Sequence, residues 1–196
     1  MGSGDHGHWL GWYEQELQIQ FREFIRPGMT VWDIGANIGF FTLLASRLVT
    51  ETGRVLAVEP HPSAAAVLRE HIRRNELSNV NVETAAVSNQ LGVASLAHGA
   101  TNSMHRLSED GPVIVSTITL DSMLETGALP QVVKLDIEGA EDLAISESAT
   151  KILTSVLPIF FIELHPPAGA EACAMLERHN YSLTTVVKSL MRAEPK

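Results

Sequence analysis

Acidic side chains and one histidine recur in this sequence directly after short apolar runs. The residues placed in this way are Asp33, Glu59, Asp136, Glu138, Glu163 and His165. Carboxylates and imidazoles can accept protons, orient a polar ligand or bind a cation. Charged groups at the ends of buried strands are costly unless a ligand or partner satisfies them, so the pattern predicts a single polar binding site.

The stretch "GANIG" is a glycine loop that begins at Gly35 and ends at Gly39. It has Asn37 where a dinucleotide-binding loop has its second glycine, the residue that lets the backbone approach a pyrophosphate. Asp33 precedes the loop, and a carboxylate there repels phosphate but attracts the ammonium and sulfonium groups of S-adenosylmethionine. The loop therefore favours a positively charged methyl donor over a phosphate ligand.

Glu59 adds a ribose-binding group to this loop. It ends the apolar run "RVLAVE", about 20 residues beyond Gly39. At this spacing, an acid at the end of a second strand accepts hydrogen bonds from both ribose hydroxyls of an adenosine. The pattern predicts an adenosine-containing cofactor, with Pro60 beside it.

The hydrophobic pattern alternates between strand and helix along the chain. The strands expected from period and composition are 30–35, 54–59, 79–87, 131–138, 157–165 and 181–187, and the helices are 13–25, 38–49, 62–75, 121–127, 139–153 and 166–180. Such alternation predicts an α/β fold: a doubly wound, mostly parallel Rossmann-like sheet with helices on both faces. Short β-prone pieces within 88–120 predict a small β insert beside it.

Composition limits the class of protein. The 196 residues fit a single domain, expected at 13–196, after a flexible N-terminus or cloning remnant at 1–12.

A net charge of -9 without a basic cluster argues against a nucleic-acid partner. We expect no membrane partner, because no apolar run approaches the roughly 20 residues that a span needs. The single Cys173 excludes an internal disulfide and favours the cytoplasm. The oligomeric state does not follow from the sequence.

Four ordered motifs resemble the FkbM family of S-adenosylmethionine-dependent methyltransferases. They are "VWDIGANIGFFTLLA", "GRVLAVEPHP", "VVKLDIEGAE" and "FFIELHP". The resemblance implies a class I methyltransferase fold and methylation of hydroxyl groups on sugars, polyketides and related natural products. It also implies that Glu59 holds the ribose and that Asp136 closes the pocket. The first cofactor motif would be Asp33, Gly35, Ala36, Asn37 and Gly39.

Two stretches depart from the usual class I pattern. Many class I methyltransferases have an Asp after the third strand that binds the adenine amino group, whereas this chain reads "VETAAVS". Backbone groups near Ala86 are the alternative, with Glu83 a weaker candidate. The sheet of this class also ends in a reversed seventh strand, so either "KSLMRA" supplies that strand or the sheet keeps an open edge.

Methyl transfer to oxygen needs a positioned hydroxyl and a group that accepts its proton. His165 is the preferred base because an ordinary imidazole titrates near neutral pH. Glu163 is placed to orient the imidazole or to act as the base itself, and Asp136 belongs to the same group. Glu141 is either a helix-start residue or part of the site, and Lys134 either enters the pocket or pairs with a carboxylate.

A divalent cation is a second way to activate the hydroxyl. Its candidate ligands are Asp136, Glu138, Glu163 and His165. We expect no resident metal, because the sequence alone does not show that these side chains converge.

The acceptor is expected to be a hydroxyl of a small molecule or glycan, recognised by the insert through Asn102, Ser103 and His105. Trp12 and Glu14 precede the first strand and either fold over the pocket or, for Trp12, pack in the core. Three alternatives remain open: an N-methyltransferase, a cofactor-binding module of the same fold without catalysis, and an NAD-dependent enzyme.

Overall fold

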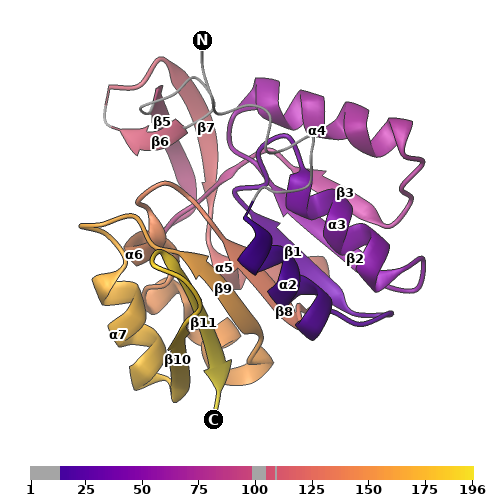
Figure 1. The fold of residues 1–196 in the computed structure, drawn as a ribbon. Helices are drawn as coiled ribbons and strands as arrows, with labels where there is room; N and C mark the ends of the chain where they lie inside the picture. The colour runs from indigo at the N-terminus through magenta and orange to yellow at the C-terminus, as the bar shows by residue number, and fades with distance from the viewer. Residues whose placement is uncertain (1–13, 99–104, 109) are drawn as a thin grey trace.

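The computed structural model describes residues 14–98, 105–108 and 110–196. Its main feature is a seven-stranded sheet in the order β10-β11-β9-β8-β1-β2-β3 (Figure 1). The strands are β1 (Thr30–Ile34), β2 (Arg54–Val58), β3 (Val80–Glu83), β8 (Val132–Leu135), β9 (Ile159–Glu163), β10 (Tyr181–Thr185) and β11 (Leu190–Pro195). The β1–β2, β2–β3, β1–β8 and β8–β9 pairs are parallel, which confirms the predicted mostly parallel α/β sheet.

Helices cover both faces of this sheet. They are α2 (Gln15–Phe24), α3 (Phe40–Val49), α4 (Pro62–Arg74), α5 (Leu120–Met123), α6 (Glu141–Ala144) and α7 (Ala170–Arg178). In β1, Val31 packs in a core cluster with residues of α2 and α3, whereas Trp32 and Ile34 pack with residues of α5 and α7. This alternation is the period of two expected for a strand buried on both faces, and it places Asp33 on the side of Val31.

The reversed seventh strand is present. Residues Leu190–Pro195 form β11, which runs antiparallel to both β9 and β10 and lies between them. Of the two alternatives for the C-terminal stretch, the one in which "KSLMRA" supplies this strand is confirmed.

The insert forms a second, four-stranded sheet in the order β4-β7-β5-β6. Its strands are β4 (Ala86–Val87), β5 (Gly92–His98), β6 (His105–Ser108) and β7 (Val113–Ile118). The prediction of one strand over 79–87 is wrong in part, because the chain leaves the main sheet after Glu83 and β4 pairs with β7 instead. The start of the insert therefore lies directly beside the carboxyl end of the main sheet.

Three predicted helices are shorter or divided in the structure. The pattern predicts one helix over 139–153, but α6 covers only Glu141–Ala144 and is followed by the 3-10 helix η2 (Glu147–Ala149) and the π-helix η3 (Ile152–Val156). The helix expected over 166–180 begins at Ala170, after its proline-rich start. The expected 121–127 helix is α5 followed by the 3-10 helix η1 (Leu124–Thr126).

Candidate active site

The glycine loop follows β1 and passes close to the end of β8. A Cβ atom on Gly35 would lie 1.7 Å from the backbone oxygen of Asp136, and one on Gly39 would lie 2.3 Å from a methyl group of Leu68. Both glycines also have positive φ, and Asn37 between them has a φ of 50°. Only a residue without a Cβ fits at Gly35, and asparagine tolerates the left-handed conformation better than most side chains.

Glu59 fixes the loop from the end of β2. Its carboxylate accepts hydrogen bonds of 2.8 Å from the backbone N–H groups of Asn37 and His61. The side chain is almost fully buried, and this burial raises the pKa of Glu59 although the two backbone bonds oppose the shift. A carboxylate held in this way presents a fixed acceptor beside the loop, as the ribose prediction requires.

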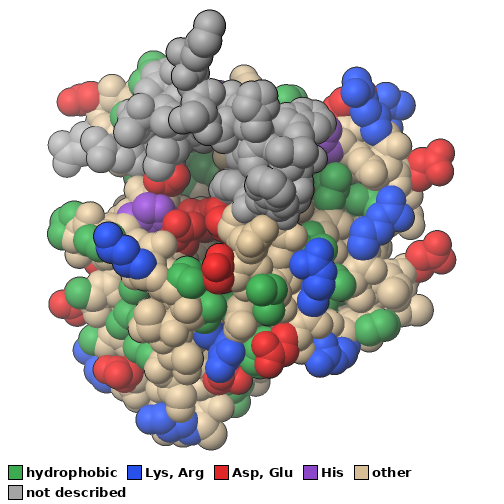
Figure 2. All heavy atoms as spheres, in the orientation of Figure 1, with side chains coloured by type: hydrophobic (Ala, Val, Ile, Leu, Met, Phe, Trp, Pro, Cys, Tyr) green, Lys and Arg blue, Asp and Glu red, His purple; other side chains and the backbone are tan. Residues whose placement is uncertain are grey.

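A cavity of about 770 Å³ opens in front of the loop, at the carboxyl ends of the parallel strands. It brings together most of the residues that the sequence singled out: Gly35, Ala36, Asn37, Gly39, Glu59, Pro60, Ala86, Asp136, Glu138, Glu163 and His165. In the space-filling view, acidic side chains gather beside a histidine left of centre (Figure 2). The described chain therefore joins the proposed cofactor loop and the proposed catalytic groups in one site.

Asp33 is the predicted cofactor residue that is not among the cavity-lining residues. Its carboxylate is fully buried, accepts a hydrogen bond from the Thr42 hydroxyl, and lies 3.5 Å from the Nζ of Lys134. Lys134 also donates to a carboxylate oxygen of Asp136 at 3.1 Å and to the backbone oxygen of Gly35 at 3.2 Å. Asp33 thus acts on the cavity through Lys134, which both lines the pocket and pairs with carboxylates.

The charge of Lys134 is stabilised at this position. Burial alone would lower the pKa of its ammonium group, but the carboxylates of Asp136 and Asp33 raise it above the usual range. The ammonium also lies 5.7 Å from the centre of the Phe41 ring. The carboxylate of Asp33 is therefore compensated inside the protein.

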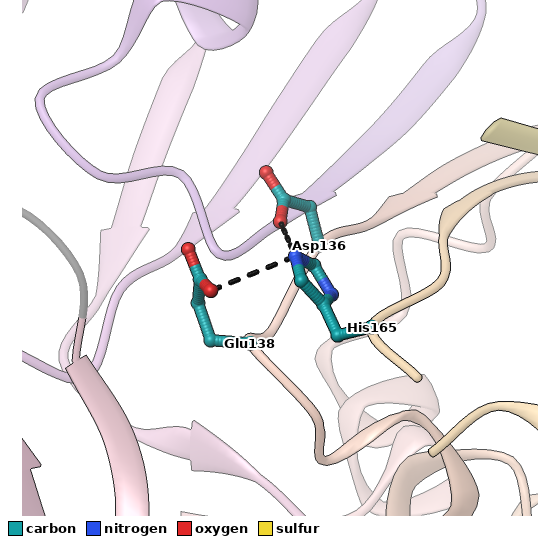
Figure 3. Close-up of side chains that lie close together, drawn as sticks. All are labelled: Asp136, Glu138 and His165. Carbon is teal, nitrogen blue, oxygen red and sulfur yellow. Dashed lines mark ion pairs between the residues drawn. The ribbon is translucent and has the colours of Figure 1, made fainter. Parts of the chain in front are cut away.

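Asp136, Glu138 and His165 point toward one another from the loops that follow β8 and β9 (Figure 3). The Nε2 atom of His165 lies 3.5 Å from a carboxylate oxygen of Glu138 and 3.9 Å from one of Asp136. The sequence placed Glu138 by extending the strand, but β8 ends at Leu135 and Glu138 reaches the site from a turn with a φ of 52°. Burial raises the pKa of the Glu138 carboxyl.

The other ring nitrogen of His165 contacts Glu141. The distance from Nδ1 to a carboxylate oxygen of Glu141 is 2.9 Å, and the Glu141 side chain is fully buried. This hydrogen bond, together with the surrounding carboxylates, raises the pKa of His165 to about 9. From the sequence, Glu163 was expected either to orient the imidazole or to act as the base, and Glu141 was either a helix-start residue or part of the site. The structure places Glu141 against the imidazole.

Glu163 ends β9 and lines the same cavity, where burial raises the pKa of its carboxyl. Its carboxylate accepts a hydrogen bond from the Ser189 hydroxyl at 3.4 Å. Glu14, at the start of α2, also lines the cavity. Ala86 lines the cavity, whereas the Glu83 side chain is exposed and is not among the lining residues.

The residues expected to recognise the acceptor are only partly described. Trp12, Asn102 and Ser103 lie outside the described residues, and His105 begins β6. Leu96 of β5 and Leu107 of β6, a cross-strand pair in the insert, line the cavity. The insert therefore borders the cavity at residues other than those named from the sequence, and its recognition of the acceptor stays a prediction.

The sheet order, the glycine loop and the acid after β2 together define a Rossmann-like class I methyltransferase fold. Residues 33–183 match the Methyltransferase FkbM domain, and the chain belongs to this family. A solved structure of Methyltransferase FkbM from Methylobacillus flagellatus superposes with a TM-score of 0.63 at 16% identity, over 90% of this chain and 50% of that chain.

Two curated relatives share part of the sequence. Hexuronic acid methyltransferase AglP from Haloferax volcanii is 31% identical over 156 residues, which are 78% of this chain and 62% of the relative. The 31-O-demethyl-FK506 methyltransferase FkbM from Streptomyces tacrolimicus is 42% identical over 69 residues, 35% of this chain and 26% of the relative. The chain spans less than two thirds of the length of these relatives.

Proposed function

We propose that this protein transfers a methyl group from S-adenosylmethionine to a hydroxyl group of a sugar or another natural product. One observation carries the proposal: His165 lines the same cavity as the glycine loop and Glu59. The family supports methyl transfer, and the names of the two relatives support a sugar or natural-product acceptor. Residues 13–196 would form one methyltransferase domain.

The cofactor site fits S-adenosylmethionine on the evidence of the donor set. Glu59 would be a fixed acceptor for the ribose hydroxyls, and Ala86 would border the adenine. The loop from Gly35 to Gly39 lines the cavity and packs closely against Asp136 and Leu68, because it lacks Cβ atoms at both ends. Asp33, Asp136 and Lys134 together carry a net negative charge beside the loop, which favours a cationic ligand. When bound, the cofactor would supply the electrophilic methyl group.

The catalytic step requires that the acceptor hydroxyl lose its proton as the new oxygen–carbon bond forms; the sulfur–methyl bond of the donor would break, with S-adenosylhomocysteine as the leaving group. In this proposal His165 accepts the proton at Nε2, and the neighbouring carboxylates of Asp136 and Glu138 stabilise the imidazolium that results. Glu163 lines the same cavity and is the alternative base.

The decisive experiment compares wild type with the His165→Ala variant. We expect turnover of hydroxyl acceptors to fall by about 10²–10⁴-fold while the affinity for S-adenosylhomocysteine stays within twofold. His179→Ala is the matched control, because His179 caps α7 and does not line the cavity. If His165→Ala methylates an amine acceptor as fast as wild type does, the result would instead support N-methylation. Cofactor binding without any transfer by wild type would support a non-catalytic module.

A divalent cation is the second candidate for activating the hydroxyl. Ligand atoms of Asp136, Glu138 and His165 all lie within 4.8 Å of one another, as do those of Glu14, Asp136 and Glu163. A cation held there would lower the pKa of a bound hydroxyl. The test is to remove metal with a chelator and then titrate Mn²⁺, while electron paramagnetic resonance and turnover are measured. If turnover does not change and the resonance shows only unbound Mn²⁺, the cation is ruled out.

We propose a small-molecule or glycan acceptor and no nucleic-acid partner, because the chain carries a net charge of -9. None of the helices in the described part of the chain is long and apolar enough to cross a membrane. The cytoplasm is the proposed location, on the ground of the single cysteine.

A further inference from the structure

Glu141 is a fully buried carboxylate that has no role in the proton transfer proposed above. It lies in the first turn of the four-residue helix α6, and one oxygen, Oε1, accepts hydrogen bonds from the backbone N–H of Gly139 and from His165. Its other oxygen, Oε2, has no hydrogen-bond partner among the described residues. A buried carboxylate is costly, so its retention here requires a compensating interaction.

The imidazole of His165 is that interaction. The carboxylate of Glu141 is an acceptor only, so the 2.9 Å contact places a proton on Nδ1 of His165. The remaining nitrogen, Nε2, is turned toward Glu138 and Asp136, at longer distances of 3.5 Å and 3.9 Å. The ring is thus hydrogen-bonded at Nδ1, whereas Nε2 has only the two longer contacts with carboxylates.

We infer that Glu141 is the positioning residue of the active site: it fixes the Nδ1–H tautomer of His165, so that the lone pair of Nε2 faces the acceptor. This inference rests on the proposed function, since it assigns the partner of the proposed base. The arrangement is that of a catalytic base oriented by a third group, where the carboxylate holds the tautomer and does not itself take the proton.

The other carboxylates of the site do not perform this task. Asp136 and Glu138 lie on the Nε2 side of the ring, and an oxygen of Asp136 already accepts a hydrogen bond from Lys134. Glu163 accepts its hydrogen bond from Ser189. Among the described residues, Glu141 is the carboxylate hydrogen-bonded to Nδ1. The Nδ1 side of the ring therefore holds the imidazole in place, and the Nε2 side accepts the proton.

The experiment combines nitrogen-15 histidine NMR with kinetics on wild type, Glu141→Gln and Glu141→Asp. NMR of wild type, above the pH at which His165 loses its extra proton, should show the Nδ1–H tautomer. In Glu141→Gln the tautomer should shift toward Nε2–H and kcat should fall by about 100-fold, with KM and S-adenosylhomocysteine affinity within twofold. Glu141→Asp should recover part of kcat. Glu147→Gln, an exposed carboxylate of the following 3-10 helix, is the matched control.

The outcomes separate this inference from the proposed function. An Nε2–H tautomer in wild type, or an unchanged kcat in Glu141→Gln, overturns the role of Glu141 while leaving methyl transfer intact. Wild type that shows the Nδ1–H tautomer but no transfer to any acceptor overturns the proposed function and leaves the positioning in place. If Glu141→Gln does not fold, the wild-type tautomer and the Glu141→Asp kinetics still decide.

Discussion

Lys134 and Asp33 face each other across the neighbouring strands β8 and β1, with both side chains buried and Nζ 3.5 Å from Oδ1. The same ammonium binds Asp136 and the backbone of Gly35. One cation therefore links the first strand, the glycine loop and the catalytic end of β8.

Removing this cation should destabilise the fold. Lys134→Met leaves Asp33 and Asp136 without their cationic partner inside the protein, and breaking a buried pair costs about 3–5 kcal/mol. Urea denaturation measures the loss. Lys151→Met, at an exposed lysine, should change the free energy of unfolding by less than about 0.5 kcal/mol. Equal stability of the two variants would contradict the linking role of Lys134.

Glu59 should control cofactor affinity. Glu59→Gln keeps the size of the side chain but removes the charge that holds Asn37 and receives the ribose, and we expect S-adenosylhomocysteine to bind about 10-fold more weakly. Isothermal titration calorimetry measures the change. Glu83→Gln is the matched control, because Glu83 ends the adjacent strand with an exposed side chain. Similar affinities in both variants would remove Glu59 from the ribose site.

Asp33 should act on the cofactor through charge rather than contact. In Asp33→Asn, the positive charge of Lys134 at the cavity loses one compensating carboxylate and repels the ammonium group of the ligand. At an effective dielectric constant near 20, two unit charges about 12 Å apart repel each other by about 1.4 kcal/mol. This energy corresponds to about a tenfold change in affinity for S-adenosylhomocysteine. Calorimetry at low salt measures it, with exposed Asp110→Asn as control. Unchanged affinity would disprove the electrostatic role.

The sequence predicted the fold because local patterns determine much of it. Apolar strands and amphipathic helices alternate with periods of 2 and 3.6, and the ends of parallel strands meet at one edge. Asp136 and His165 could therefore be placed together from their positions after two such strands. Glu138 was placed correctly at that edge, but for the wrong local reason, since a turn rather than a strand carries it.

The partner of His165 could not be predicted in the same way. Glu141 lies 24 residues before it, and only the tertiary fold brings the two side chains within 2.9 Å. Glu141 lies near a predicted helix start, where a carboxylate is common. The sequence therefore did not indicate that its side chain is buried. The pairing of Asp33 with Lys134 depends likewise on the register of β1 and β8, which local periodicity does not fix.

The stability of the protein should depend on the protonation of His165. Its folded pKa, about 9, is above the ordinary value of 6.5, so protonated His165 contributes stability that is fully present below about pH 6.5 and is lost as the pH rises through 9. Relative to His165→Asn, wild type should therefore lose stability between pH 6.5 and 9. Urea unfolding across that range measures the difference, and parallel curves for the two proteins would contradict it.

Turnover should change with pH in the opposite direction. His165 accepts a proton only when it is neutral, and Glu141, Asp136 and Glu138 favour its protonated form. Because the folded pKa lies near 9, the fraction of neutral His165 in the free enzyme rises about tenfold per pH unit between 6.5 and 8. We expect kcat/KM of wild type to rise with pH and to level off near 9, whereas the residual activity of His165→Ala should lack this rise. Initial rates at saturating cofactor, measured from about pH 6.5 to about 9.5, test the expectation; a flat wild-type profile would mean that another group accepts the proton.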